Sequence, residues 1–413
     1  MNASCTPDSV TLTAFEDALE QLLGDARPCG ETETVALAAA RDRVLATRLY
    51  SDINVPPADN SAMDGYAMAS QDYQAAGEYT VAVSQRIAAG QAAVPLEAGT
   101  AARIFTGAPL PAGADTVLMQ EHCIAGEGSV TFTAPLRAGA NVRRAGEDIA
   151  ARDAILEAGQ RLRPQDIGLA ASVGIAGLPV YRRVRVASLF TGDELVEPGR
   201  ALAAGQIYNS NRYLLNGMLE GMNCELLDHG PVPDNLEATR QAVTAAARTA
   251  DLVVTSGGVS VGEEDYVRLA LEDLGELRLW RIAVKPGKPL AYARVQDTPF
   301  IGLPGNPVSA FVTFCLFVRP FVHRLQGRAD VLPRGVPVPA AFEWRKSGKR
   351  REYLRARLVQ NGRDGPHLEI YPNQGSGVLT STCWADGLAE IPVGTSVAPG
   401  DTVRFYPFSE LLA

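Results

Sequence analysis

Apolar side chains recur at helical spacing in two separate segments of the first half of the chain. Residues 13–24 carry an apolar face and begin with Thr13 and Glu16, which match the capping box of a helix start. The same spacing returns at Arg163–Val173. A helical linking region is therefore predicted, composed of residues 1–50 and 145–181.

Between these two parts the pattern is different. From about Ser51 to Arg144, short runs of alternating apolar and polar residues are separated by Gly and Pro turns, which is typical of β-strands. This block, residues 51–144, is predicted to be a β-rich domain inserted into the linking region.

From Arg182 onward, strand and helix patterns alternate. This alternation predicts a three-layer α/β domain with a mostly parallel sheet over residues 182–328. After a linker, residues 332–413 return to short runs and Gly turns, which predicts a C-terminal small β domain. The whole chain is thus predicted to be a multidomain protein of the α/β plus β class. The predicted strands are 184–190, 225–227, 252–255, 279–284, 290–294 and 300–303, and the predicted helices are 211–219 with Asn211 as N-cap, 235–249, 264–274 and 308–325.

Gly-rich loops follow three of the predicted strands. In a mostly parallel sheet ligands bind at the carboxyl ends of the strands, and the loops 191–194, 256–258 and 304–307 all lie there. A loop of this kind before a helix directs backbone N–H groups at one point, which suits phosphate or another tetrahedral anion. Between the second and third loops, Lys285 and Lys288 add two ammonium groups beside prolines. A tight strand-to-helix turn is the alternative interpretation of each loop taken alone.

Three acidic residues also follow predicted strands. Glu194, Asp234 and Asp265 could bring their carboxylates to the same edge of the sheet, and acidic groups beside an anion site are expected where Mg²⁺ also binds. For an isolated Asp265, capping of the helix 264–274 is the simpler interpretation. The working hypothesis is a site for phosphate and metal together.

Charge narrows the classes of function. The chain has 413 residues and a net charge of −9, which argues against non-specific binding to nucleic acid or to an anionic membrane. Residues 331–413 differ, with 10 basic and 8 acidic residues, and seven of the basic ones lie in Arg345–Arg357. In a strand, Arg355 and Arg357 of this basic run would point the same way.

Several features indicate a soluble cytoplasmic protein. The six cysteines form no C-x-x-C pair, which fits a reducing compartment and argues against a structural zinc site. The first ten residues lack the pattern of a signal peptide. The most apolar run, Pro307–Val318, stops at Arg319 and Pro320 and is too short to span a bilayer.

Nine motifs occur in an order that is found in one enzyme family. They are PPADNSAMDGYA (56–67), IFTGAPLPAGAD (104–115), RRAGEDI (143–149), LFTGDEL (189–195), IYNSNRY (207–213), SGGVSVGEEDYV (256–267), KPGKP (285–289), LPGNPVSA (303–310) and NQGSGVLTS (373–381). Single motifs are weak signals, but nine in order span nearly the whole chain. On these motifs the chain resembles the molybdopterin molybdenumtransferases, that is, the MoeA proteins and the homologous E domain of gephyrin.

The resemblance implies a homodimer of four-domain subunits that inserts molybdate into adenylylated molybdopterin and releases AMP, assisted by Mg²⁺. Transient contacts with a molybdopterin adenylyltransferase and with apo-molybdoenzymes are also expected. The residues that the resemblance places in catalysis are Glu194, Asp234 and Asp265, which would hold or position the metal, and Asp59, Thr106 and Asp148 from the inserted-domain side. The residues expected to bind molybdate or the pterin phosphate are Ser256, Gly257, Gly258, Ser260, Lys285, Lys288, Pro304, Gly305, Asn306, Pro307, Ser309, Arg355 and Ser376.

Two other functions remain open at this point. Adenylylation of molybdopterin by ATP is one, because the α/β domain alone resembles that enzyme family, although the domains at 1–180 and 331–413 argue against it. A non-catalytic scaffold is the other, against which the intact set of charged residues argues. Arg355 is one of four arginines in 350–357 that could bind the oxyanion.

Overall fold

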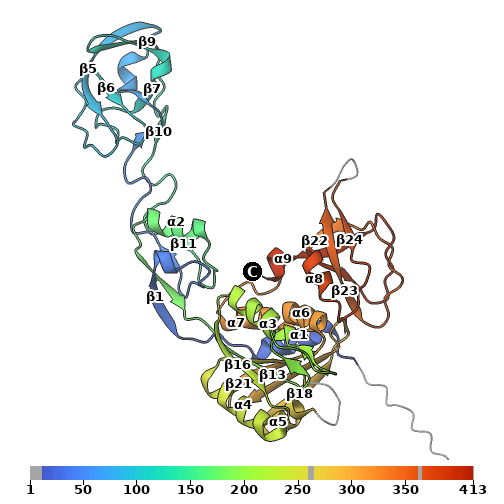
Figure 1. The fold of residues 1–413 in the computed structure, drawn as a ribbon. Coiled ribbons are helices and arrows are strands. Elements are labelled where there is room, and N and C mark those ends of the chain that lie inside the picture. Colours follow the sequence, from blue (N-terminus) through green and yellow to red (C-terminus); the bar gives the residue numbers. More distant parts are fainter. Residues whose placement is uncertain (1–11, 259–264, 361–364, 413) are drawn as a thin grey trace, which may run out of the picture.

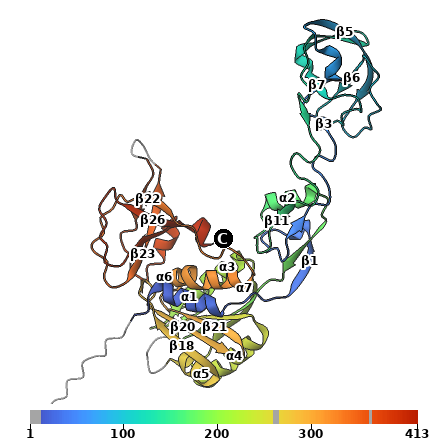
Figure 2. The same ribbon diagram turned by 180° about the vertical axis from the view of Figure 1, so that it is seen from behind.

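The computed structural model describes residues 12–258, 265–360 and 365–412. Figures 1 and 2 show an elongated molecule in which the α/β domain and the C-terminal β domain lie side by side as a body. A narrow arm leads from this body to a β-rich domain at its far end. The architecture confirms the predicted combination of α/β and β domains.

A six-stranded sheet forms the centre of the α/β domain. In spatial order its strands are β16 (Glu225–Val232), β13 (Arg185–Thr191), β17 (Leu252–Ser256), β21 (Thr298–Leu303), β20 (Pro289–Val295) and β18 (Gly275–Arg281). The first four run parallel, and β20 and β18 extend the sheet in the antiparallel sense. Side chains alternate between two apolar layers, since Val186 and Phe190 join one cluster and Ala187 and Leu189 the other. The predicted three-layer, mostly parallel domain is confirmed.

Helices cover both faces of this sheet. On one face lie α4 (Leu236–Thr249) and α5 (Tyr266–Leu274), and on the other α3 (Ser210–Gly221) packs beside the long helix at 307–325. Asn209, rather than the predicted Asn211, caps α3, because its side chain accepts a hydrogen bond from the backbone N–H of Arg212 at 3.2 Å. Asn211 is therefore available for another role.

The first helix, α1 (Phe15–Asp25), belongs to the body and not to the linking region in which it was predicted. Its buried residues Ala18, Leu19 and Leu22 join the same apolar cluster as α3 and the long helix. The backbone N–H of Thr13 also donates to the carbonyl of Arg281 at 2.9 Å. The apolar face of a helix predicts that the helix packs against a core. It does not indicate which domain provides that core.

The long helix is continuous through the residues at which the sequence predicted its apolar run to end. It consists of α6 (Pro307–Thr313), a π-helical turn (Phe314–Val318) and α7 (Arg319–Leu325). Among the described residues it is the one helix long and apolar enough to cross a membrane, and 94% of its apolar window is buried. The argument from length was therefore wrong, and burial identifies the segment as a core helix.

The arm consists of two segments of chain that run side by side. Its elements are β1 (Thr32–Ala36) paired with β12 (Gly177–Tyr181), β2 (Leu49–Tyr50) paired with β11 (Ala154–Leu156), and α2 (Pro164–Ser172). The helix predicted at 163–173 is confirmed, but the outgoing half of the arm is built of strands. A small apolar cluster that includes Leu45, Leu162 and Val180 holds the arm together.

The domain at the end of the arm is β-rich, as predicted. Its main sheet has the order β7 (Thr116–Met119), β4 (Gly65–Met68), β6 (Ala101–Ile104), β5 (Gly77–Ile87), β9 (Ser129–Ala134) and β8 (Cys123–Ala125). A separate short pair, β3 (Asn60–Ser61) with β10 (Val142–Arg143), lies where the domain joins the arm.

The C-terminal domain shares its sheet with a strand from the preceding domain. The order is β19 (Val284–Lys285), β23 (Arg351–Val359), β25 (Gly387–Ile391), β26 (Thr402–Pro407) and β22 (Val336–Pro339), with β24 (His367–Ile370) also paired to β23. Two short helices, α8 (Thr380–Trp384) and α9 (Phe408–Leu411), complete the domain. Because β19 opens the KPGKP segment, the two lysines of that segment are anchored between the two domains of the body.

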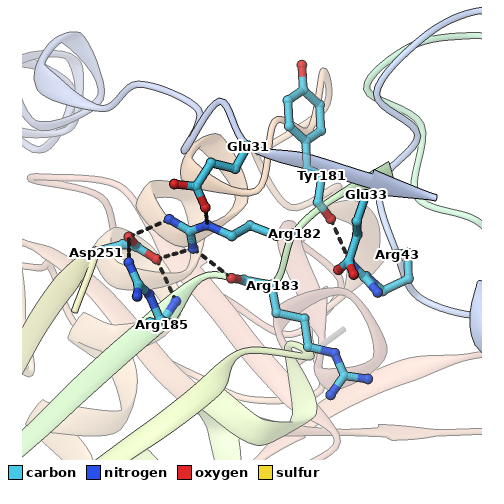
Figure 3. Close-up of polar contacts among 8 residues, drawn as sticks. All are labelled: Glu31, Glu33, Arg43, Tyr181, Arg182, Arg183, Arg185 and Asp251. Atoms are coloured by element: carbon cyan, nitrogen blue, oxygen red, sulfur yellow. Dashed lines mark hydrogen bonds and ion pairs between the residues drawn. The ribbon is translucent and has the colours of Figure 1, made fainter. Parts of the chain in front are cut away.

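A polar network fixes the arm to the body (Figure 3). The guanidinium of Arg182, next to the end of β12, makes two hydrogen bonds to the carboxylate of Asp251, at 2.6 and 2.8 Å, and also contacts Glu31. Asp251 accepts a further hydrogen bond from the backbone N–H of Arg185 at 2.7 Å. Residues of both arm segments and of the central sheet thus meet at one partly buried carboxylate.

Candidate functional site

One large cavity, of about 840 Å³, lies at the carboxyl ends of the parallel strands. It is lined by the loops after β13, β17 and β21, by the KPGKP segment and by residues of the C-terminal domain. This is the position at which an α/β sheet of this kind binds its ligand. The predicted site residues that line the cavity are Glu194, Ser256, Gly257, Lys285, Lys288, Pro304, Gly305, Asn306, Pro307, Ser309 and Ser376.

Two of the Gly loops are tied to each other by side chains. The hydroxyl of Ser256 donates to the carbonyl of Pro304 at 2.9 Å, and the amide of Asn211 donates both to that hydroxyl and to the carbonyl of Gly305, each at 2.8 Å. Gly258 has a φ of +65°, and a Cβ there would lie 2.6 Å from the side chain of Val267. The loops are therefore held in one arrangement, and Gly258 supports it from behind the cavity wall.

Cationic side chains dominate the charge of the cavity. Among the described lining residues, Lys285, Lys288 and Arg350 are basic and Glu194 is the one acidic residue. Lys285 is already paired, since its ammonium lies 3.1 Å from the carboxylate of Glu352, which is buried in β23. The excess of positive charge suits an oxyanion.

Arg350, and not Arg355, is the arginine of the basic run that lines the cavity. Arg355 is fully buried behind the wall. Ser376 reaches the cavity from the C-terminal domain, and its carbonyl accepts a hydrogen bond from the backbone N–H of Val308, at the start of α6, at 3.0 Å. The basic run Arg345–Arg357 predicted a basic wall, but the sequence did not indicate which arginine lines the cavity.

The three predicted metal-binding carboxylates do not form a ready-made metal site. Within the described residues, no group of three or more His, Cys, Asp or Glu side chains is arranged to hold a metal ion. Glu194 lines the cavity, whereas Asp265 is buried at the N-cap of α5 and accepts a hydrogen bond from the backbone N–H of Arg268 at 3.4 Å. Asp234, which precedes α4, does not line the cavity either. The predicted convergence is thus absent from the described part of the chain.

The remaining predicted residues lie elsewhere. Asp59 and Thr106 adjoin β3 and β6 of the inserted domain, and Asp148 lies between β10 and β11, where this domain joins the arm. Figure 1 shows β6 and β10 far along the molecule from β13 and α6, whose neighbouring loops line the cavity. Ser260 lies outside the described residues.

The residues of the inserted domain are ordered by hydrogen bonds among the motifs themselves. Asp59 accepts a hydrogen bond from the backbone N–H of Ala145 at 2.8 Å and pairs with Arg144 at 2.5 Å, and these two contacts lower the pKa of its carboxyl. Both the backbone N–H and the hydroxyl of Thr106 donate to the carboxylate of Asp64 at 2.8 Å. Asp64, which the sequence analysis did not single out, thus fixes the position of Thr106.

Comparisons with known proteins agree with this geometry. Residues 13–174 match the MoeA N-terminal region (domain I and II), residues 187–324 a probable molybdopterin binding domain, and residues 337–408 the MoeA C-terminal region (domain IV).

The chain is 40% identical over 392 residues to a molybdopterin molybdenumtransferase from Haemophilus influenzae, covering 92% of this chain and 95% of that one. A molybdopterin molybdenumtransferase from Nostoc sp. is 37% identical over 384 residues, with 90% and 88% covered. The molybdopterin biosynthesis MoeA protein from Pyrococcus horikoshii superposes with a TM-score of 0.79 at 31% identity, over 96% of this chain and 99% of that one. The chain therefore belongs to the molybdopterin molybdenumtransferase (MoeA) family.

Proposed function

We propose that this enzyme inserts molybdate into adenylylated molybdopterin, cleaving the pyrophosphate link and releasing AMP. The observation that carries the proposal is the cavity at the edge of the sheet, where basic side chains and Gly loops surround a space of about 840 Å³. Family membership supplies the class of substrate, because the curated relatives are molybdopterin molybdenumtransferases.

Both substrates are oxyanions, so the site must hold negative charges close to one another. Lys288 and Arg350 are proposed to bind molybdate. The backbone N–H groups of Gly257 and Val308 already donate to carbonyls of the protein, so phosphate is proposed to be bound by Lys285 and by the hydroxyl of Ser309 at the start of α6. Donors that are already fixed in place stabilise charge developing in the transition state without reorganising. Electrostatic stabilisation and positioning are therefore expected to supply most of the rate.

Magnesium is proposed to assist this reaction. The described residues bring one carboxylate, Glu194, to the cavity. One carboxylate is sufficient for partial coordination, because Mg²⁺ commonly keeps several waters. Its other ligands come from one or two carboxylates and from substrate phosphates. When bound, the ion would neutralise charge on the phosphate oxygens. Asp265 and Asp234 are proposed to position this assembly from behind the wall.

The active site is further proposed to be completed by a second copy of the chain. Asp59, Thr106 and Asp148 lie in the inserted domain and its junction with the arm, whereas the cavity is lined by residues of the body. Figures 1 and 2 show the inserted domain and the body at opposite ends of the arm. A homodimer with two-fold symmetry can bring such distant surfaces together, and each site then uses both chains.

One experiment tests the proposed reaction. The purified protein is incubated with adenylylated molybdopterin, Mg²⁺ and molybdate, and AMP is measured over time. AMP release without consumption of ATP is expected. Consumption of ATP with unmodified molybdopterin would indicate adenylyltransferase activity instead, and no turnover of either substrate would indicate a non-catalytic protein.

A further inference from the structure

A second cavity, called the junction cavity below, lies where the arm meets the body. Its volume is about 580 Å³. The body lines it with residues within 23–28, at the end of α1, and within 324–329, at the end of the long helix. The arm contributes Ala158, Gly159 and Tyr181. None of these residues lines the cavity of the proposed active site, so the two cavities are separate.

Two glycines let the arm approach the body closely beside the junction cavity. Gly327 has a φ of +80°, and a Cβ there would lie 2.4 Å from the ring of Tyr181. Gly159 has a φ of +79°, and its carbonyl accepts a hydrogen bond from the backbone N–H of Ala329 at 3.1 Å. Figure 3 shows the ring of Tyr181 pointing away from Asp251, so these contacts are distinct from the polar network drawn there. The shape of the junction cavity therefore depends on the position of the arm.

The charged side chains of the junction cavity are all basic. Arg27, Arg324 and Arg328 line it, and no Asp or Glu does so among the described lining residues. In a chain with a net charge of −9, three arginines around one cavity are an exception. Carboxylates that are next to lining residues in the sequence are paired with other arginines. These pairs are Asp25 with Arg278 at 3.4 Å, Glu157 with Arg48 at 2.7 Å and Asp330 with Arg334 at 2.7 Å.

Two of the cavity arginines have no carboxylate partner in the described part of the chain. Arg27 donates to backbone carbonyls at the end of α1, that of Gly24 at 2.6 Å and that of Ala26 at 2.9 Å. The Nε of Arg324 is buried and has no hydrogen-bond partner among the described residues. A guanidinium without a counterion is a group that an anion can bind with little competition from the protein.

The third arginine is held by a neutral side chain. The Nη1 of Arg328 lies 2.8 Å from the Nε2 of His323. Burial lowers the pKa of His323 well below its usual value, so its ring is neutral at pH 7. Burial, together with the charges of Arg319 and Arg161, also lowers the pKa of Arg328 to about 10. An anion beside Arg328 would relieve this accumulation of positive charge.

We propose that the junction cavity binds a small polyanion, a molecule with two or more phosphate or carboxylate groups, and that the bound molecule holds the arm against the body. Arginine binds both kinds of group through paired N–H donors. The volume lies within the range of roughly 300–1,000 Å³ that is usual for small-molecule sites. Because arm residues line the same cavity as the three arginines, a bound polyanion contacts both parts of the molecule.

The test uses the full-length protein without Mg²⁺, with inorganic pyrophosphate and citrate as probes that separate phosphate from carboxylate recognition. Arg324→Met and Arg27→Met each remove one positive charge from the junction cavity. Arg240→Met is the matched control, because Arg240 lies on α4, pairs with Asp273 at 3.2 Å and does not line the cavity. All variants are also made in a Lys288→Ala background, which weakens anion binding in the proposed active site.

Calorimetry measures affinity, and hydrogen exchange measures the contact between arm and body. Wild type should bind at least one probe, and each cavity variant should weaken this binding about tenfold or more, the effect of one charge-assisted contact. Arg240→Met should retain the wild-type affinity. The bound probe should slow exchange in the peptides that contain Gly159 and Ala329. Without a probe, Arg324→Met should be at least as stable as wild type, since it removes a charge that lacks a counterion.

Three results would overturn the proposal. They are the absence of binding of both probes to wild type, binding that neither cavity variant weakens, and binding that leaves exchange at Gly159 and Ala329 unchanged. A change of oligomeric state in Arg324→Met, seen by native mass spectrometry, would show that a second copy of the chain occupies the cavity instead. Arg27 is exposed, so Arg27→Met decides between these outcomes if Arg324→Met fails to fold.

Discussion

At the scale of single residues, the basic side chains of the cavity make the most direct prediction. Lys288→Ala or Arg350→Ala should raise the molybdate concentration that gives half the maximal rate by about 10- to 100-fold, since each removes a charge-assisted contact worth roughly 1.5–3 kcal/mol. The concentration of adenylylated molybdopterin that gives half the maximal rate should change less. Initial rates of AMP release at varied molybdate concentration measure this.

Lys349→Ala is the matched control, because Lys349 is an exposed neighbour of Arg350 that does not line the cavity. It should retain the wild-type molybdate dependence. Unchanged dependence in both Lys288→Ala and Arg350→Ala would reject the assignment of these side chains to the oxyanion.

Asp265 separates a structural role from a catalytic one. Asp265→Asn should keep the cap of α5, because asparagine also accepts the hydrogen bond from the backbone N–H of Arg268. Thermal stability should therefore stay close to wild type, while most AMP release should be lost because the negative charge is gone. Near wild-type turnover of the purified variant would show that Asp265 serves only as a helix cap.

The sequence predicted the chemistry of this site better than the identity of its residues. Gly-rich loops after buried strands indicate where an anion binds, and the observed cavity lies at Ser256 and Pro304 as predicted. In contrast, the sequence did not distinguish Arg350 from Arg355. Arg350 immediately precedes β23, whereas Arg355 lies in the buried part of that strand. That difference depends on packing between domains, which sequence spacing alone does not contain.

At the scale of elements, the position of α1 leads to a further prediction. Leu22 is fully buried in the cluster beneath the long helix. Leu22→Ala should lower the free energy of unfolding by about 2–5 kcal/mol, the usual cost of a cavity in a packed core. Glu20→Ala, on the exposed face of the same helix, should have little effect in the same denaturation experiment. An equally small effect of Leu22→Ala would mean that α1 does not contribute to the body.

The misplacement of α1 in the sequence analysis has a physical cause. Helix and strand types along 182–328 could be predicted because their apolar spacing is local. The partner of an apolar face is set by long-range packing, so neither the docking of α1 on the body nor the entry of β19 into the C-terminal sheet could be predicted. The arm shows the same limit, because its outgoing half forms strands only by pairing with residues more than a hundred positions later.

At the scale of the whole molecule, the polar network of Figure 3 should make the attachment of the arm sensitive to acid. Burial alone would raise the pKa of Asp251, but hydrogen bonds from Arg182 and Arg185 outweigh it and lower the pKa. A carboxyl whose pKa is lowered on folding contributes stability above its unfolded pKa, about 3.9, and loses it as the pH falls through the folded pKa. The free energy of unfolding should therefore decline below about pH 4.

Asp251→Asn tests this in urea denaturation at several pH values. The variant should be less stable than wild type at pH 7 and should lose less stability on acidification. Asp52→Asn, at an exposed position of the arm, should follow the wild-type profile. A wild-type pH dependence in Asp251→Asn would show that another group governs the acid response.

The length of the arm leads to the last prediction, which is that no single chain has a complete active site. Asp59 immediately precedes β3 and Asp265 caps α5. Figure 2 shows β3 at the far end of the arm and α5 in the body. Homodimers of Asp59→Ala and of Asp265→Ala should each be inactive. When they are mixed and exchange subunits, about half the dimers become mixed, and each of those has one intact site of two.

Activity should then return to about a quarter of wild type. The reason is that the intact site of a mixed dimer takes Asp59 from the Asp265→Ala chain and Asp265 from the Asp59→Ala chain. Native mass spectrometry measures the exchange, so that a failure to mix is separated from a failure to complement. If mixed dimers form and no AMP is released, Asp59 acts within its own chain and the site is not shared. An Asp59→Ala homodimer that is active by itself would show instead that Asp59 has no part in the reaction.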